Sequence, residues 1–186
     1  MTELETALVE IASFLNEMQW SYMLIGGLAV ALWGEPRATL DVDVSIWVEP
    51  EDFDEAVGRI SASFRTIPDA LGFARRSRVV PIVTSQGIRG DLVLAALPQE
   101  RSLIDRARRK MMGGVPIPVA TVEDLILMKL ISERQKDLDD AKRLLRRFGA
   151  TLDAPYLEPQ LQQFAEALGR PDILETYRSE IRKASG

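Results

Sequence analysis

Two aspartates separated by one valine, Asp41 and Asp43, lie in the otherwise apolar segment DVDVSIWV. Alternate side chains of an extended strand project from the same face, so the two carboxylates share one side with their backbones about 7 Å apart. Two-metal sites hold their cations roughly 4 Å apart, a separation that such a pair can bracket. The motif therefore predicts a cation site, whereas the alternative is a strand with one wet face.

Two adjacent glycines, Gly26 and Gly27, end an apolar segment, and thirteen residues separate them from Asp41. Exposed N–H groups at the start of the following helix would attract an anion, and a phosphate held there could reach a cation held by the aspartates. The alternative is a tight turn. Asp91, in GIRGDLVLA, opens a further β-like run and could add a third carboxylate, although it could also be a turn residue after Gly90.

The 186 residues include no histidine and no cysteine. Nucleophilic machinery that depends on a histidine base is excluded, as are zinc sites built from His or Cys. A general base must be a carboxylate, Lys or Tyr, and a bound metal must take oxygen ligands, which favours Mg²⁺. The absence of cysteine also suits a cytoplasmic protein.

Charge is unevenly distributed along a chain whose net charge is −5. The first hundred residues are acidic, whereas residues 101–150 carry more Lys and Arg than Asp and Glu. A basic segment after an acidic half favours an enzyme that meets a second anion, although Arg-rich solvated helices would give the same pattern. No apolar run is long enough to span a membrane, and the first residues lack a signal-peptide pattern.

Periodicity predicts helices and strands in alternation, followed by helices alone. We expect an α/β (α+β) core over 1–120, with a mixed sheet flanked by helices, and a helical region over 121–186. Thr121 with acids in the following turn is a strong helix start. The expected helices lie at 3–18, 27–34, 49–64, near 102–110, from 121, and in two or three further segments broken near 153–155 and 169–171; the expected strands lie at 22–26, 41–48, on either side of the turn at 85–87, and at 115–120.

The spacing of Gly-Gly, Asp-Val-Asp and a later lone Asp resembles the nucleotidyltransferase superfamily of the DNA polymerase β type. The segments RATLDVDV and EDLILMKLISERQKDLDDAKRLL are more specifically similar to the AbiEii/AbiGii toxin group. The resemblance covers roughly residues 20–148 and implies a nucleotidyltransferase-like fold. It departs at Gly27, where many members carry serine.

The resemblance implies roles for individual residues. Gly26 and Gly27 would hold a triphosphate, Asp41 and Asp43 would bind two Mg²⁺ ions, and Asp91 would complete one metal shell and orient or deprotonate the acceptor hydroxyl. Lys129 is implied as a catalytic phosphate contact. Further nucleotide-binding positions are Arg37, Thr39, Arg134 and Lys136, and Asp137 and Asp140 match the charged pattern of the group.

Lys129 also stands out without the resemblance, because it interrupts the apolar run LILMKLI. One interpretation is that Lys129 lies in the wall of a binding site. The other is a surface helix stabilised by the pairs Lys129–Glu133 and Lys136–Asp140, each worth a few tenths of a kcal/mol.

The function expected from these features is metal-dependent transfer of a nucleotide from an NTP to an acceptor hydroxyl. The toxin-like resemblance implies an RNA acceptor, tRNA in particular, or a protein side chain, and a cognate antitoxin as partner. The alternatives are a small-molecule adenylyltransferase of the aminoglycoside type and a non-catalytic binding module that retains the fold.

Overall fold

The computed structural model describes residues 1–34 and 39–184, which form two compact units. Residues 1–29 and 39–120 make up the first unit, and residues 30–34 and 121–184 make up the second. Over these described ranges, no helix combines the length and apolar character that a membrane crossing requires.

The first unit is built on a mixed seven-stranded sheet in the order β3-β4-β5-β2-β1-β7-β6. β2 runs parallel to β5 and β1 parallel to β7, whereas the other neighbours are antiparallel. The predicted mixed sheet flanked by helices is confirmed. The strands are β1 (Tyr22–Ile25), β2 (Asp41–Trp47), β3 (Arg65–Thr66), β4 (Val79–Val83), β5 (Arg89–Ala95), β6 (Arg108–Met112) and β7 (Val115–Val119).

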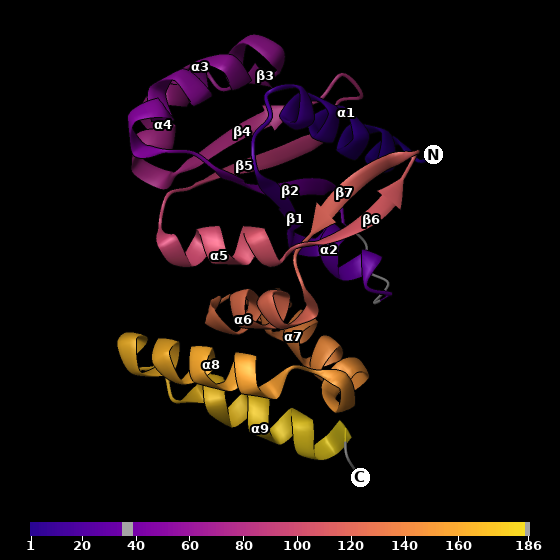
Figure 1. The fold of residues 1–186 in the computed structure, drawn as a ribbon, viewed down its shortest axis with the longest axis vertical. Helices are drawn as coiled ribbons and strands as arrows, with labels where there is room; N and C mark the ends of the chain where they lie inside the picture. The colour runs from indigo at the N-terminus through magenta and orange to yellow at the C-terminus, as the bar shows by residue number, and fades with distance from the viewer. Residues whose placement is uncertain (35–38, 185–186) are drawn as a thin grey trace. The chain divides into compact units, whose positions relative to one another are not determined.

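Helices cover both faces of this sheet (Figure 1). On one side lie α1 (Glu3–Glu17), α3 (Phe53–Ser63), which follows the short 3-10 turn η1 (Pro50–Asp52), and α4 (Ala70–Ser77). On the other side lies α5 (Pro98–Arg106). The capping box at Thr2 begins α1, and its apolar stripe, which includes Leu8 and Ile11, is fully buried. Alternation along β2 buries Val42, Val44 and Ile46 on the α1 side, which leaves the aspartates on the other face.

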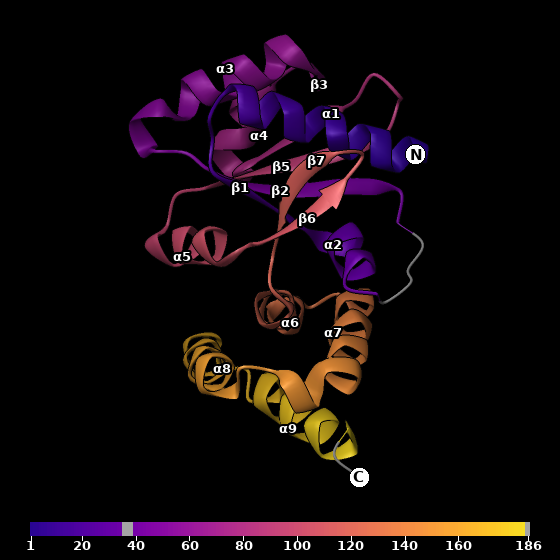
Figure 2. The same ribbon diagram turned by 45° about the vertical axis from the view of Figure 1, so that its right-hand side comes forward.

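The helix α2 (Gly26–Leu32) follows β1 directly and begins within the first unit. The second unit contains α6 (Val122–Ile131), α7 (Gln135–Phe148), the short turn η2 (Gly149–Thr151), α8 (Ala154–Leu168) and α9 (Asp172–Ala184) (Figure 2). The predicted Thr121 cap is confirmed, because its hydroxyl accepts a hydrogen bond from Asp124 N at 3.1 Å. The predicted breaks between the last helices are also confirmed.

One predicted element is wrong in its second half. The helix expected near 102–110 ends at Arg106, and Arg108–Met112 is the strand β6. Gly113 and Gly114 both have positive φ, so they form a tight connection that folds β6 back against β7. The hairpin pairing with β7 thus overrides the helix propensity of the Arg-rich segment. Sequence periodicity also missed β3 and α4. The helix predicted from residue 121 ends at Ile131.

Candidate active site

Asp43 and Asp91 face each other across two parallel strands. The register of β2 and β5 pairs Asp43 with Asp91 and Asp41 with Arg89. Neighbouring strands are about 4.8 Å apart, and directly paired residues project from the same face. All three aspartates therefore stand on the face opposite α1, within one small area of the sheet.

Gly26 lies directly against this area. Its φ of +69° falls in the left-handed region, and a Cβ added there would lie 2.8 Å from Asp43 Cγ. A side chain at position 26 would thus be strained in its backbone and would displace the Asp43 carboxylate. Gly27, the next residue, is buried in the first turn of α2. The closely spaced glycines of the sequence are therefore next to the aspartates in space.

The aspartates differ in their surroundings. The Thr39 hydroxyl donates a hydrogen bond to Asp41 Oδ1 at 2.8 Å, which holds the exposed Asp41 side chain at the start of β2. Loss of solvent, and secondly the negative charge of Asp41, raise the pKa of the Asp91 carboxyl above its ordinary value. Negative charge thus accumulates here, as it does where a cation or a cationic ligand is to be held.

The side chains present suit a hard cation in their chemistry, since every donor is a carboxylate oxygen. Because Gly26 has no Cβ, there is room beside the Asp43 side chain. Within the ranges that the structure describes, no three acidic side chains are already close enough to enclose one ion. The two opposed carboxylates of Asp43 and Asp91 therefore match a cation that takes several ligands from water and substrate phosphates, as Mg²⁺ does.

A cavity of about 510 Å³ adjoins the carboxylates on the side of β4 and β3. Asp41 and Asp91 contribute to its wall, together with two arginines, Arg65 and Arg89, that were not predicted as site residues. Arg89 lies two residues before Asp91 on β5, whereas Arg65 is brought to the aspartates only by the pairing of β3 with β4 and of β4 with β5. The pairings of β3 with β4 and of β2 with β5 join segments that are distant in the sequence, so no short motif signals them.

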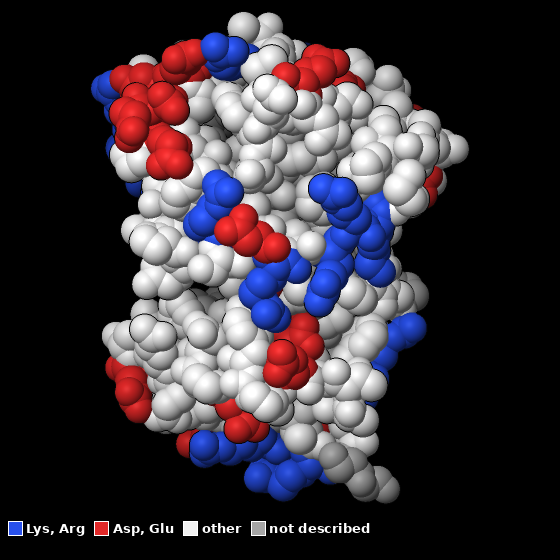
Figure 3. Space-filling view, in the orientation of Figure 1, with Lys and Arg blue, Asp and Glu red and all other residues white. Residues whose placement is uncertain are grey.

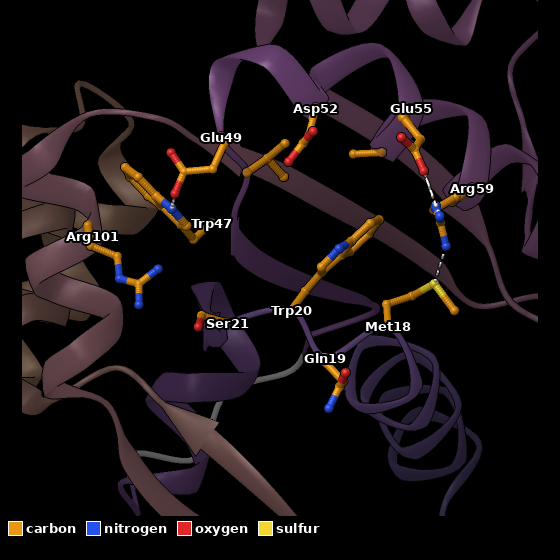
Figure 4. A pocket seen from close by; sticks show the side chains of 12 residues that line it. Met18, Gln19, Trp20, Ser21, Trp47, Glu49, Asp52, Glu55, Arg59 and Arg101 are labelled. Atoms are coloured by element: carbon orange, nitrogen blue, oxygen red, sulfur yellow. Dashed lines mark hydrogen bonds and ion pairs between the residues drawn. The ribbon is translucent and has the colours of Figure 1, made fainter.

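A second cavity, of about 440 Å³, lies at the other end of β2 (Figure 4). It is lined by residues around Trp47, six residues and thus roughly 20 Å along the strand from Asp41. Its polar groups largely satisfy one another: Trp47 Nε1 donates to Glu49 at 2.8 Å, and Arg59 pairs with Glu55 at 2.6 Å. This cavity is separate from the carboxylates.

Lys129 lies inside the second unit rather than on an open surface. Its side chain is 8% exposed and pairs with Asp137 and, at 3.3 Å, with Asp140, both on α7. The Asp137 carboxyl also accepts hydrogen bonds from Ser132 and Arg134. Despite its burial, these cationic and hydroxyl partners lower the pKa of Asp137. The lysine thus joins α6 to α7, instead of pairing with Glu133, which lies beyond the end of α6.

The other predicted nucleotide contacts are in different settings. Arg134 pairs with Asp137 at 2.6 Å, whereas Lys136 is exposed, and both belong to the second unit. Thr39 contacts Asp41, as described above. Arg37 lies outside the described residues.

The basic segment splits between the two units. Arg108, Arg109 and Lys110 lie on the edge strand β6, where basic side chains gather in Figure 3. On α7, Arg143 pairs with Asp140 and Arg146 with Glu180, each at 2.5 Å. The Arg143 pair lies within α7, whereas the Arg146 pair joins α7 to α9. On β6, Arg108 and Arg109 are exposed.

Comparison with solved structures identifies the fold. An antigenic nucleotidyltransferase-like protein from Paracoccidioides brasiliensis superimposes with a TM-score of 0.57 at 19% identity, over 95% of this chain and 92% of its own. ANT(2")-Ia in complex with adenylyl-2"-tobramycin gives a TM-score of 0.58 at 15% identity, over 88% of this chain and 98% of its own. The lincosamide antibiotic adenylyltransferase LnuA, with lincomycin bound, gives 0.51 at 14%, over 75% and 94%.

No protein-family model matches the sequence, and no curated protein matches it either. The likeness to these solved structures shows that the chain has a nucleotidyltransferase-like fold, which confirms the predicted fold class.

Proposed function

We propose that this protein is a Mg²⁺-dependent nucleotidyltransferase that transfers a nucleoside monophosphate from an NTP to an acceptor hydroxyl. The observation that carries the proposal is the opposition of Asp43 and Asp91 on adjacent parallel strands, with Gly26 against Asp43. The nucleotidyltransferase-like fold supports it, as does the likeness to LnuA, which is named an adenylyltransferase.

Each residue has a task in this proposal. Gly26 and Gly27 offer backbone N–H groups to the triphosphate, and the missing Cβ lets it approach Asp43. Asp41, Asp43 and Asp91 would hold two Mg²⁺ ions, which supply positive charge for the attacking and leaving oxygens when bound. Asp91 orients the acceptor hydroxyl and accepts its proton as the acceptor oxygen bonds to the α-phosphorus. The bond from that phosphorus to the bridging oxygen breaks, and pyrophosphate leaves with the electron pair.

The residues of the second unit are assigned supporting roles. Arg134 and Lys136 are proposed nucleotide contacts, as are Thr39 of the first unit and Arg37. Lys129 is proposed to contribute through the ion-pair network with Asp137 and Asp140, because its ammonium group is already occupied. A phosphate contact by Lys129 would require that network to open.

The experiment that tests the transfer uses NTPs labelled at either end. Each of the four NTPs, carrying the label on the α- or the γ-phosphate, is incubated with the protein, Mg²⁺ and total tRNA or candidate proteins. We expect the α-label on the acceptor and the γ-label in pyrophosphate. Transfer of the γ-label to the acceptor would indicate a kinase instead, and no NTP binding would favour the non-catalytic module.

A second candidate is a small-molecule adenylyltransferase. It is favoured by the likeness to LnuA and to ANT(2")-Ia, whose names connect them with lincomycin and tobramycin. Under the toxin-like resemblance the acceptor would instead be RNA, tRNA in particular, or a protein, and a cognate antitoxin would be a partner. Adding tobramycin or lincomycin in place of tRNA in the same assay separates the two.

A further inference from the structure

The cavity beside the carboxylates has an ordered wall. Strand register places Arg65, Val83, Arg89 and Asp41 in one line across β3, β4, β5 and β2. Pro81, Asp91 and Asp43 form the next line on the same face. The cavity of about 510 Å³ is thus bordered by Arg65 and Arg89, by the apolar Val83 and Pro81, and by the carboxylates of Asp41 and Asp91. That volume is within the range of small-ligand sites.

The side chains of Arg65 and Arg89 are exposed, and neither side chain makes a hydrogen bond or ion pair with any residue in the described ranges. Arg89 forms no ion pair even with Asp41, which its register places directly opposite. By contrast, the neighbouring arginines Arg59, Arg75 and Arg78 each pair with a carboxylate. Two uncommitted guanidinium groups at the mouth of an acidic site are therefore available to a ligand.

The spacing of these groups indicates what that ligand carries. Arg65 and Arg89 are two strand spacings apart, about 10 Å at the backbone, so their long side chains can converge on one anion. A guanidinium matches phosphate oxygens in a bidentate geometry. Arg89 precedes Asp91 by two residues, which places an anion bound there about 7 Å along the strand from that carboxylate. The apolar strip of Val83 and Pro81 lies between them.

We propose that Arg65 and Arg89 select an acceptor that carries a phosphate close to its reacting hydroxyl, that is, a nucleotide unit. The phosphate lies on the two arginines, the sugar and base lie over Val83 and Pro81, and the hydroxyl is directed to Asp91. The reaction at that hydroxyl rests on the proposed function. The arginines touch only the acceptor phosphate, so they determine specificity and take no part in proton transfer. A polycationic acceptor would meet two like charges here.

The test measures binding without turnover. Fluorescently labelled nucleoside 5′-monophosphate and a short single-stranded RNA are titrated with the protein in the absence of Mg²⁺, with and without a non-hydrolysable NTP analogue that fills the donor site. The variants are Arg65→Ala and Arg89→Ala, with Arg182→Ala, an exposed arginine of α9, as the matched control. Each cavity variant should weaken probe binding about tenfold or more, because a charge-assisted hydrogen bond is lost. The control should match the wild type.

Unchanged affinity in both cavity variants would overturn the proposal, as would a wild type that binds neither probe or binds tobramycin more tightly than either. Tighter binding of the RNA identifies the terminal nucleotide of a strand as the acceptor, whereas equal binding identifies a free nucleotide. A parallel titration with the NTP analogue and Mg²⁺ tests the donor site separately. Failure of that titration alone would sink the proposed function while leaving the phosphate-binding cavity in place.

Discussion

At the scale of single residues, Gly26 shows what an absent side chain provides. The sequence predicted that the glycine pair precedes a helix, and the structure adds that position 26 has positive φ and lies against Asp43. Gly26→Ala should lower the free energy of unfolding by about 1 kcal/mol or more through the left-handed backbone alone. Its effect on nucleotide transfer should be far larger, because the added methyl displaces the Asp43 carboxylate.

The measurements are chemical denaturation and transfer rates of Gly26→Ala beside a control, Gly87→Ala, which shares positive φ but has open space around its Cβ position. Both variants should lose stability, Gly26→Ala at least as much as Gly87→Ala because of its added contact with Asp43, and only Gly26→Ala should lose activity. Equal activities would separate Gly26 from the site.

Sequence reasoning reached the carboxylates but not the arginines, and the reason is the range of the interactions. Alternation within DVDVSIWV is local, so it correctly predicted Val42 and Val44 as buried and the aspartates as facing away. Arg89 acquires its relation to Asp41 through the pairing of β5 with β2, and Arg65 only through three successive strand pairings. The partners of Lys129 lie on the next helix, which intrahelical spacing does not reveal.

At the scale of elements, the contact between α6 and α7 depends on a buried charge network. Lys129→Met removes the cation shared by Asp137 and Asp140, which are themselves almost fully buried. Leaving buried carboxylates with fewer partners should lower the free energy of unfolding by about 3 kcal/mol. Urea denaturation measures this, with the exposed Lys136→Met as the matched control, expected to change stability by less than about 0.5 kcal/mol. Unchanged stability with lost nucleotide binding would instead support Lys129 as a direct phosphate contact.

The contact between α7 and α9 predicts how the second unit responds to acid. Arg146 and Lys183 hold the pKa of Glu180 at about 2, below its ordinary value of 4.5. Because the folded carboxyl binds its proton less readily than the unfolded one, this pair stabilises the fold fully above about pH 5, and the contribution is lost as the pH falls toward 2. Thermal unfolding should therefore show a smaller loss of Tm between pH 6 and pH 3 in Glu180→Gln than in the wild type. Parallel pH profiles would contradict the assignment.

At the scale of the whole molecule, accessible positive charge is predicted to set how an acceptor is bound. Arg108 and Arg109 lie on the exposed edge strand β6, whereas Arg143 and Arg146 of α7 pair with carboxylates. If β6 contacts an RNA backbone, labelling of tRNA should fall steeply between low and moderate salt, as counterion release requires. The double variant Arg108→Ala, Arg109→Ala should reduce that slope and leave NTP binding unchanged. A flat salt response would point to a small acceptor, for which only one or two charges are screened.

The central claim is that the opposed aspartates support Mg²⁺-dependent nucleotide transfer, and Asp43→Asn tests it most directly. The measurement is pyrophosphate release from NTP, with the acceptor present, over a Mg²⁺ titration of wild type and variant, together with thermal unfolding without metal. We expect the wild type to release pyrophosphate only when Mg²⁺ is added, and we expect the variant to release none. The variant's unfolding temperature should be equal or slightly higher, because repulsion among neighbouring carboxylates is relieved. A folded Asp43→Asn protein that releases pyrophosphate as fast as the wild type would contradict the claim and leave the aspartates as the solvated face of a strand.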